Sequence, residues 1–318
     1  IMEKGKLIVI EGTDCSGKET QSKRLIERLN KDSIKTVYYS FPKYDTPTGR
    51  IVGFPYLGKP YLAQELIEQE SKKIYSGLRH KYPNIDRILD IMNAIHPNKF
   101  TDEEVEQINM ALIPIFEIFY KEKSDVKQQL LLAVVLSEVI DEISHGWFKE
   151  GAPAVDPKVA SLYYAADRRY NLPIMNNILE DGTNIVLDRY TYSSMAHQGG
   201  KFLDPVSRAQ MFEWLDTLEF GLLGLPHSDT RLFLHMPTDY AAILKKERKE
   251  LLDEHEKDSK HLYNAERAYM EIAEKYDFHT IECVRNEHCA TPCKKDIKTP
   301  EEISDEVYSC VKKQLKFH

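Results

Sequence analysis

The chain has 318 residues, of which 42% are hydrophobic and 30% are charged, a composition typical of a folded globular protein. This length accommodates one large α/β domain or two smaller ones. A formal net charge of −8 disfavours nucleic-acid binding through the whole surface, so an anionic ligand would need local clusters of Lys, Arg and backbone N–H groups. No stretch approaches the roughly 20 apolar residues that a membrane span needs, so we expect neither a nucleic-acid nor a membrane partner.

The cysteine content favours a reducing compartment. Five is an odd number of cysteines, which does not suit a complete set of disulfides. An apolar run begins already at Leu7, so we expect no signal peptide and a cytoplasmic location. Cys283, Cys289 and Cys293 lie beside His288, but their spacing is not a common zinc pattern. We therefore expect unpaired surface thiols there.

The first predicted elements are a strand, a glycine-bounded loop and a helix. The apolar run at 7–10 predicts a buried strand over residues 7–11, and apolar residues recur with helical spacing over 20–31. The glycines between them let the backbone curl so that its N–H groups point inward, and the helix N-terminus adds positive potential. This pattern predicts a P-loop that binds the phosphates of a nucleoside triphosphate. The predicted loop residues are Gly12, Thr13, Asp14, Cys15, Ser16, Gly17, Lys18, Glu19 and Thr20.

One position in this loop departs from the usual pattern. Lys18 would reach the β- and γ-phosphates, and the next residue is normally a Ser or Thr that ligates Mg²⁺. Here it is Glu19, which has no hydroxyl, and Thr20 lies roughly 100° further round the helix. Mg²⁺ could be held by Thr20, by Asp188 through water, or mainly by the nucleotide.

Later elements alternate between strands and helices. The last helix is expected to begin at Thr299, where a cap, a proline and Glu302 form a capping box. Further strands are predicted at 36–39, 184–187, 231–235 and 280–284, and helices at 159–180, 205–218, 238–251 and 261–276. The alternation predicts an α/β fold with a doubly wound parallel sheet flanked by helices. Ligands then bind at the carboxyl ends of the strands.

Residues 59–152 break this alternation. They contain no convincing strand, and an almost wholly apolar run at 129–136 must be buried in a core or an interface. Helical segments are predicted near 61–80, 84–96, 101–122 and 125–147. We predict a core of residues 1–58 and 153–318, with a helical insertion of unknown role at 59–152.

Three further segments, together with the P-loop, carry a family resemblance. Phe41-Pro42 follows the second strand, and residues 161–168 read SLYYAADR. Asp188-Arg189-Tyr190 follows the strand at 184–187. In this order the segments resemble the thymidylate kinases, a family of P-loop nucleoside monophosphate kinases. The resemblance covers residues 5–58 and 155–316, and it includes a lid at about 245–262.

The resemblance implies the transfer of a phosphoryl group from ATP to dTMP, with Mg²⁺, in the synthesis of dTTP. By position, Asp14 matches an aspartate that contacts the sugar 3′-hydroxyl, Tyr164 an aromatic that stacks on thymine, and Arg189 an arginine that binds the monophosphate. Arg168 matches an arginine that hydrogen-bonds the base. The full expected dTMP site is Asp14, Phe41, Pro42, Tyr164, Arg168, Arg189, Ser193 and Gln198. The expected catalytic residues are Lys18, Arg189, Asp14 and Arg248, and the expected metal ligands are Asp188 and Thr20.

Two positions lack a positive charge that some family members have. Tyr44 stands where some place a phosphate-contacting arginine, and the P-loop lacks an arginine that others have. The charge would then come from the lid. Lys245, Arg248 and Lys249 share a helical face, and Arg248 is the candidate that neutralises the transferring phosphoryl. A solvated basic face is the alternative.

Several alternatives remain open at this stage. Tyr164 could be an ordinary core aromatic, Arg168 a surface partner of Asp167, and Asp188 a cap at a strand end. The acceptor could be dUMP or another nucleoside monophosphate. The chain could also be a catalytically weak nucleotide-binding interaction protein, with the insertion as its partner surface. Family members are commonly homodimers, so a homodimer is a further expectation.

Overall fold

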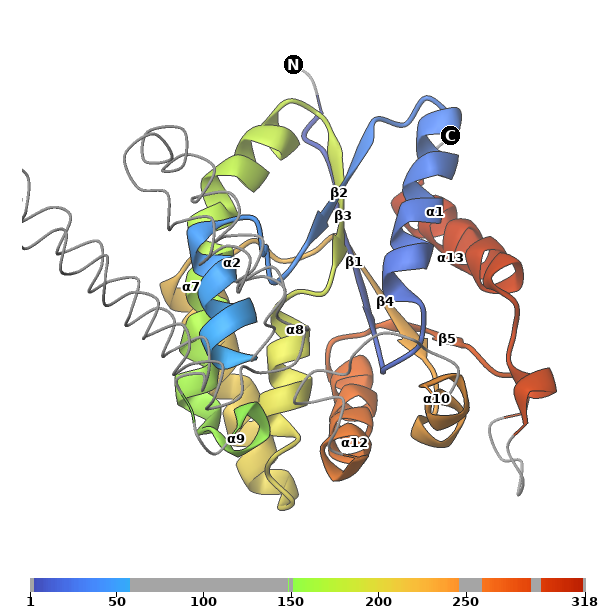
Figure 1. Ribbon diagram of the computed structural model, residues 1–318. Coiled ribbons are helices and arrows are strands. Elements are labelled where there is room, and N and C mark those ends of the chain that lie inside the picture. The colour runs from blue at the N-terminus through green and yellow to red at the C-terminus, as the bar shows by residue number, and fades with distance from the viewer. Residues whose placement is uncertain (1–2, 58–147, 149–150, 246–258, 287–292, 317–318) are drawn as a thin grey trace, which may run out of the picture. The chain divides into compact units, whose positions relative to one another are not determined.

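A computed structural model describes residues 3–57, 148, 151–245, 259–286 and 293–316. The chain divides into two compact units, Ile1–Gly49 with Val155–His318, and Arg50–Ala154. The first unit contains a five-stranded sheet with helices on both faces (Figure 1).

All five strands are parallel, in the order β2-β3-β1-β4-β5. They are β1 (Leu7–Gly12), β2 (Thr36–Ser40), β3 (Asn184–Asp188), β4 (Thr230–His235) and β5 (His279–Glu282). Strand β1 is central, with Ile10 beside Asp188 of β3 and Gly12 beside Leu234 of β4. The carboxyl ends of the three central strands therefore meet at one edge. The predicted fold class and the five predicted strands are confirmed.

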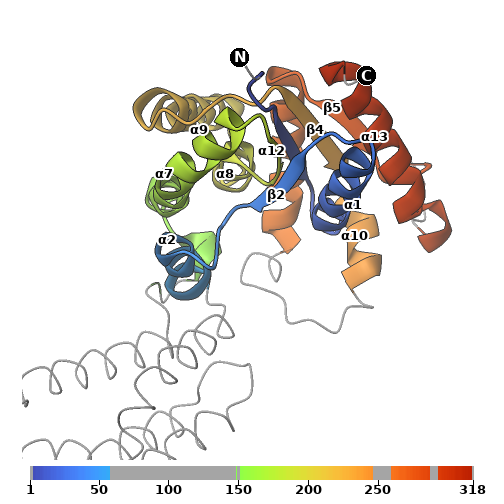
Figure 2. The ribbon, with the colours of Figure 1, turned by 90° about the horizontal axis from the view of Figure 1, so that it is seen from above.

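Two hydrophobic cores flank the sheet, because successive side chains of a strand point to opposite faces. Leu7 and Val9 of β1 pack into one core, and Ile8 and Ile10 into the other. The first core receives side chains from α7 (Pro157–Glu180), α8 (Thr191–Ser194), α9 (Pro205–Asp216) and α12 (Ser259–Lys275). The second receives side chains from α1 (Lys18–Lys31), α10 (Thr238–Lys245) and α13 (Pro300–Leu315). Figure 2 shows α7 and α9 on one side of the sheet and α1 and α13 on the other.

Local sequence signals explain where several helices begin. Asp156 accepts the N–H groups of Lys158 and Val159 at the start of α7. The predicted capping box of Thr299 and Glu302 is present at the start of α13. The remaining described elements are short: α2 (Pro47–Ile51), and the turns η1 (Val52–Tyr56), η2 (Ala152–Ala154), η3 (Met195–Gly199), η4 (Thr217–Leu222) and η5 (Lys294–Asp296).

The predicted insertion falls mainly on residues 58–147, outside the described part of the chain, as do the four helical segments and the apolar run at 129–136. Within the second unit, the rings of Tyr56 and Phe148 meet edge to face at 6.1 Å, and the Tyr56 hydroxyl donates to the carbonyl oxygen of Ala152. Most of the predicted lid, residues 246–258, is likewise outside the described residues. The role of the insertion stays a prediction.

The described cysteines differ in exposure. Cys283 is fully buried beyond β5, so the expectation of a surface thiol is wrong for this residue, whereas Cys293 is exposed. The burial of Cys283 follows from its position directly after β5, where it packs in the same core as Ile281. No described group of three or more His, Cys, Asp or Glu side chains is arranged to hold a metal ion. Among the described helices, none has the length and apolar character needed to cross a membrane.

Candidate active site

The loop between β1 and α1 has the backbone of a phosphate-binding loop. Cys15 and Gly17 adopt φ angles of 57° and 78°, the left-handed conformation from which anion-binding backbone concavities are built. A Cβ atom on Gly12 would lie 2.4 Å from Ser16 Oγ and 2.7 Å from the carbonyl oxygen of Leu234. Only glycine therefore fits where β1 ends.

Thr13 and Lys18 fix this loop in place. The Thr13 hydroxyl donates to the carbonyl oxygen of Met236 at 2.6 Å and accepts the Met236 N–H at 2.7 Å, which ties the loop to the end of β4. The Lys18 ammonium donates to the carbonyl oxygens of Gly12 and Thr13 at 3.0 and 2.9 Å. Burial, with the nearby charge of Arg189, lowers the pKa of Lys18 to about 8.

Asp14 meets a lysine that was predicted only as part of a basic cluster. Lys245, the last residue of α10, lies 2.6 Å from its carboxylate, and both side chains are largely buried. Burial opposes ionisation of Asp14, but the Lys245 hydrogen bond and the charges of Lys18 and Arg189 hold its pKa below the ordinary value. Lys245 is therefore the residue of the predicted basic cluster that the structure brings to the P-loop. Arg248, the predicted catalytic lid residue, lies outside the described residues.

The candidate metal ligands differ in their surroundings. Glu19 is exposed and pairs with Lys23 at 2.5 Å, and Thr20 is also exposed. Asp188 is buried at the end of β3, where its Oδ2 accepts the Tyr38 hydroxyl at 3.1 Å. Its Oδ1 is buried and has no hydrogen-bond partner among the described residues. A carboxylate oxygen of this kind suits Mg²⁺, which is bound by one or two carboxylates together with substrate phosphates and water.

Arg189 occupies a strained turn at the end of β3. Its φ angle is 68°, and its N–H donates to the carbonyl oxygen of Ile10. Its guanidinium is half-buried and, within the described part of the chain, has no hydrogen-bond or ion-pair partner. Burial alone would lower its pKa, but Tyr269 and Asp188 hold the pKa above the ordinary value. A permanently charged guanidinium at this edge of the sheet is suited to an anion.

Glu11 is a site residue that the sequence analysis missed. Its carboxylate is fully buried and accepts four hydrogen bonds: from the N–H of Tyr190 at 2.7 Å, the N–H and hydroxyl of Ser193 at 3.1 and 2.6 Å, and the hydroxyl of Tyr269 at 3.1 Å. The available signal was strand alternation. Glu11 comes two residues after Val9, so its side chain points to the same covered face of the sheet. A carboxylate on that face requires buried donors.

Arg168 is buried in an ion pair, and the alternative of a surface pair with Asp167 is wrong. Its guanidinium donates twice to Glu219, at 2.7 and 2.8 Å, and both side chains are at most 2% exposed. It also donates to the Tyr190 carbonyl oxygen and the Ser194 hydroxyl at 3.0 and 2.9 Å. The buried Nε has no partner in the described residues. Arg168 thus supports the turn that carries Arg189.

The predicted base-pocket residues are partly brought together. The Arg168 guanidinium lies 6.0 Å from the ring centroids of both Tyr164 and Phe41, and the Phe41–Pro42 peptide bond is cis. Gln198, on η3, is fully buried, and neither polar atom of its amide has a partner among the described residues. An unsatisfied buried polar group costs about 1–3 kcal/mol, so this amide marks a position for a polar ligand.

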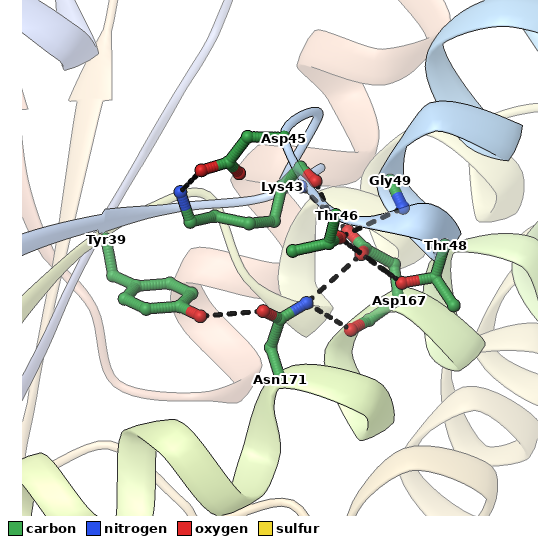
Figure 3. Close-up of polar contacts among 8 residues, drawn as sticks. All are labelled: Tyr39, Lys43, Asp45, Thr46, Thr48, Gly49, Asp167 and Asn171. Carbon is green, nitrogen blue, oxygen red and sulfur yellow. Dashed lines mark hydrogen bonds and ion pairs between the residues drawn. The ribbon is translucent and has the colours of Figure 1, made fainter. Parts of the chain in front are cut away.

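Asp167 anchors the segment after Pro42 (Figure 3). Its buried carboxylate accepts the Lys43 N–H at 2.8 Å and the hydroxyls of Thr46 and Thr48 at 3.1 and 2.8 Å. The Asn171 amide, one helical turn along α7, donates to the same carboxylate at 3.2 Å. Adjacent residues of α7 therefore hold two different turns at the sheet edge: Asp167 the one after β2, and Arg168 the one after β3.

A parallel sheet with this strand order, whose central strand leads into a phosphate-binding loop, defines a P-loop nucleotide-binding protein. The sequence model of the thymidylate kinase family matches residues 10–54 and 137–291, more than half of the chain. The chain therefore belongs to the thymidylate kinase family, as the resemblance in its motifs predicted.

Individual relatives match over shorter segments. A thymidylate kinase of Plasmodium falciparum is 46% identical over 50 residues, which are 16% of this chain and 24% of that protein. The putative thymidylate kinase 251L of Invertebrate iridescent virus 6 is 42% identical over 62 residues, 20% of this chain and 29% of the relative. The matched segments thus span about a quarter of the length of these relatives.

A solved structure supports the fold over nearly the whole chain. A thymidylate kinase from Candida albicans matches with a TM-score of 0.53 at 17% identity, and it covers 98% of this chain and 92% of its own. At this identity the likeness concerns the fold.

Proposed function

We propose that this protein phosphorylates dTMP to dTDP, with ATP as donor and Mg²⁺ as the bound metal. The observation that carries the proposal is a pair of cationic groups at one edge of the sheet, Lys18 in the P-loop and Arg189 at the end of the adjacent strand. They are close enough for the charge of Arg189 to lower the pKa of Lys18. Phosphoryl transfer needs two anions aligned with each other and their charge neutralised, and two such sites meet that need.

On the donor side, the loop N–H groups and Lys18 bind the ATP phosphates. Lys18 is held by the Gly12 and Thr13 carbonyl oxygens, so its ammonium is already at the mouth of the loop. Lid residues 245–262 close over the nucleotides and exclude water, to which the phosphoryl group would otherwise be lost. Lys245 and Arg248 supply the positive charge that the P-loop lacks.

On the acceptor side, Arg189 binds the monophosphate, because a guanidinium fork matches phosphate oxygens. Tyr164 stacks on the base, which contributes about 1–3 kcal/mol. The Arg168 Nε and the Gln198 amide bind its polar edge, since both are buried without a described partner. Asp14, Phe41, Pro42 and Ser193 complete the site around the sugar and the base.

Asp188 holds Mg²⁺ through its buried Oδ1, and the exposed Thr20 is the less suitable of the two candidate ligands. When bound, the metal ion neutralises charge on the phosphate oxygens. Asp188 also binds the Tyr38 hydroxyl, which fixes the orientation of its carboxylate.

A coupled assay of ADP release tests the function. Purified protein is supplied with ATP, Mg²⁺ and, one at a time, dTMP, dUMP, dGMP and other monophosphates. We expect the highest kcat/KM with dTMP; the panel is needed because the related Candida albicans structure is described as revealing an origin of broad substrate specificity. Highest turnover with another monophosphate would reassign the acceptor. No turnover above background with any of them would leave the nucleotide-binding interaction protein.

The exposed face of α7 supports a homodimer. Val159, Leu162, Tyr170 and Ile174 recur on one side of this helix and are 39–51% exposed. Beside them lies an open, mainly apolar groove of about 550 Å³ lined by Ala166, Leu218 and Leu223 among others. An apolar surface of this extent is typical of an interface. We expect a dimer in sedimentation and a monomer after Tyr170→Asp; a monomeric wild-type protein would remove this proposal.

We assign the protein to the cytoplasm. Among the described residues, Cys283, Cys293 and Cys310 form no disulfide, as expected in a reducing compartment. Imaging of a tagged protein in its own cell tests this assignment.

A further inference from the structure

The Glu11 carboxylate is an unusual group to find where it lies. It is fully buried at the carboxyl end of the central strand, one residue before the P-loop glycine. Burial raises its pKa, while its hydrogen bond with Ser193 and the charge of Arg189 act in the opposite direction. A buried carboxylate is retained only where several donors compensate for the loss of water. Four donors do so here.

These donors come from two separate parts of the fold. The N–H of Tyr190 and both donors of Ser193 belong to the turn after β3 and the start of α8, and the hydroxyl of Tyr269 belongs to α12. Ser193 and Tyr269 also meet each other, with their oxygens 3.0 Å apart. The Glu11 carboxylate on β1 therefore joins the turn after β3 to α12.

The turn that Glu11 holds is the one that carries Arg189. The left-handed conformation of Arg189 is sparsely populated for a residue with a side chain, and it persists only where the surroundings fix it. Two successive N–H groups fix it here: that of Arg189 binds the Ile10 carbonyl oxygen, and that of Tyr190 binds Glu11. Ile10 and Glu11, consecutive residues of β1, thus set the direction in which the Arg189 side chain projects from the backbone.

We propose that Glu11 is a positioning residue, which fixes the Arg189 turn and thereby aligns the guanidinium with the acceptor phosphate. The inference rests on the proposed function, because it assigns the anion at Arg189 to the monophosphate. Glu11 acts through the donors that it binds, namely the backbone N–H groups of Tyr190 and Ser193 and the hydroxyls of Ser193 and Tyr269, and not through contact with the nucleotide. Its role is to fix the position of the turn after β3 relative to β1, the strand that leads into the P-loop.

The role of Glu11 can be tested by measuring how much the phosphate group of dTMP adds to binding. For each variant, the dissociation constants of thymidine and of dTMP are measured by calorimetric titration, and their ratio reports what the phosphate adds. Glu11→Asp shortens the side chain by one methylene, so its carboxylate no longer reaches both N–H groups. We expect the ratio to fall roughly tenfold, because small misplacements of a binding group have large effects. ATP binding, measured separately, should change by less than about twofold.

The matched control is Asp229→Asn. Asp229 also accepts a backbone N–H of β1, that of Leu7, but at the opposite end of the strand. Its ratio of dissociation constants should equal that of the wild type. In the Arg189→Ala background, Glu11→Asp should have no further effect on the ratio, because the group that it positions is gone.

The outcomes separate the two proposals. If the wild type binds dTMP no more tightly than thymidine, the proposed function fails. If it does prefer dTMP but Glu11→Asp leaves the ratio unchanged while lowering the melting temperature, Glu11 is only structural and the inference is overturned. If Glu11→Asp does not fold, Tyr269→Phe removes one donor and keeps the ring. We then expect roughly a threefold fall in the ratio, and an unchanged ratio would overturn the inference.

Discussion

The loop after β1 and the turns after β2 and β3 lie at the same edge of the sheet, but they are held in different ways. The P-loop takes its shape from its own neighbours, because Ser16 binds the carbonyl oxygen of Thr13, three residues away, and Lys18 that of Gly12, six residues away. A distant contact, between the Thr13 hydroxyl and Met236, then ties the loop to the end of β4. The turn after β2 is held by Asp167, 124 residues from Lys43. The shape of the donor loop is thus set by short-range contacts, whereas the turns of the acceptor half take theirs from contacts across the fold.

Buried carboxylates do most of the assembly on the acceptor side. Glu11 holds the turn after β3 from the strand, Glu219 holds it through Arg168, and Asp167 holds the segment after β2. Such groups add little net stability but admit few alternative geometries, because an unmatched donor or charge is expensive when buried. Loss of a donor-side group should therefore impair chemistry, whereas loss of an acceptor-side anchor should impair alignment or folding.

The donor half is tested most strongly by Lys18→Ala. We expect kcat/KM for ATP to fall roughly 10³-fold, because a charge aimed at the transferring phosphates is lost, with the melting temperature nearly unchanged. Lys23→Ala is the matched control, since Lys23 is exposed, forms its one ion pair among the described residues with Glu19, and otherwise lies 5.7 Å from the Tyr38 ring. It should retain near wild-type activity in the same coupled assay. Near-normal activity of Lys18→Ala would remove Lys18 from the ATP site.

On the acceptor side, Glu219→Gln should act on stability. It leaves the Arg168 guanidinium buried without its counter-charge, which lowers the free energy of unfolding by about 3–5 kcal/mol. Urea unfolding measures the loss. The exposed pair of Arg28 and Asp305 provides the control, because Asp305→Asn should leave the unfolding midpoint unchanged within error. Equal losses of stability in Glu219→Gln and Asp305→Asn would contradict a structural role of the buried Arg168–Glu219 pair.

The same contrast explains which features the sequence could predict. The five strands and the P-loop follow from local patterns, namely apolar runs, glycines at fixed spacing and a lysine. The capping box at Thr299 is equally local, and it is present as predicted. These features depend on residues a few positions apart, so a single sequence contains their signal.

The acceptor anchors could not be predicted in this way. The partner of Arg168 is 51 residues away, on the π-helical turn η4. The sequence suggested its neighbour Asp167 instead, but adjacent residues on a helix do not face each other. Glu11 accepts hydrogen bonds from residues 179 and 258 positions away, so its role depends on sheet order and helix packing. Pairing of Lys245 with Asp14 likewise needed the folded α10.

A pH titration of binding sharpens the comparison. Burial lowers the pKa of Lys18 to about 8, whereas the pKa of Arg189 is raised. Above pH 8 the ammonium loses its proton, so ATP affinity of the free enzyme should fall up to about tenfold per pH unit. Affinity for dTMP should stay flat over the same range, because Arg189 remains charged. Parallel falls in the two affinities would contradict separate donor and acceptor cations.

Asp167→Asn tests the anchor of the segment after β2. The variant amide keeps only one acceptor oxygen, so its NH₂ group faces either the Lys43 N–H or the two hydroxyls, and the segment loses part of what fixes its position. We expect KM for dTMP to rise about tenfold while KM for ATP changes by less than about twofold. Asp45→Asn is the control, because Asp45 is exposed in the same segment and, among the described residues, its hydrogen-bond partner is the Lys43 ammonium (Figure 3). A rise in both KM values would indicate general loss of structure.

The smallest effect is expected at Glu19, the residue that departs from the P-loop pattern. Because Glu19 is exposed and paired with Lys23, replacing it by serine should shift the half-saturating Mg²⁺ concentration by less than about threefold. Asp188→Asn, at the buried strand end, should raise that concentration at least about tenfold. Activity measured against Mg²⁺ concentration distinguishes the two variants.

If Glu19→Ser instead lowered the Mg²⁺ requirement strongly, the metal would depend on α1, and the donor half would lack a ligand that the motif normally supplies. An unchanged requirement in Glu19→Ser together with a raised one in Asp188→Asn would mean that Mg²⁺ depends on the end of β3, so that the metal links the donor nucleotide to the strand that leads into the Arg189 turn. Unchanged requirements in both variants would mean that the nucleotide itself holds the metal.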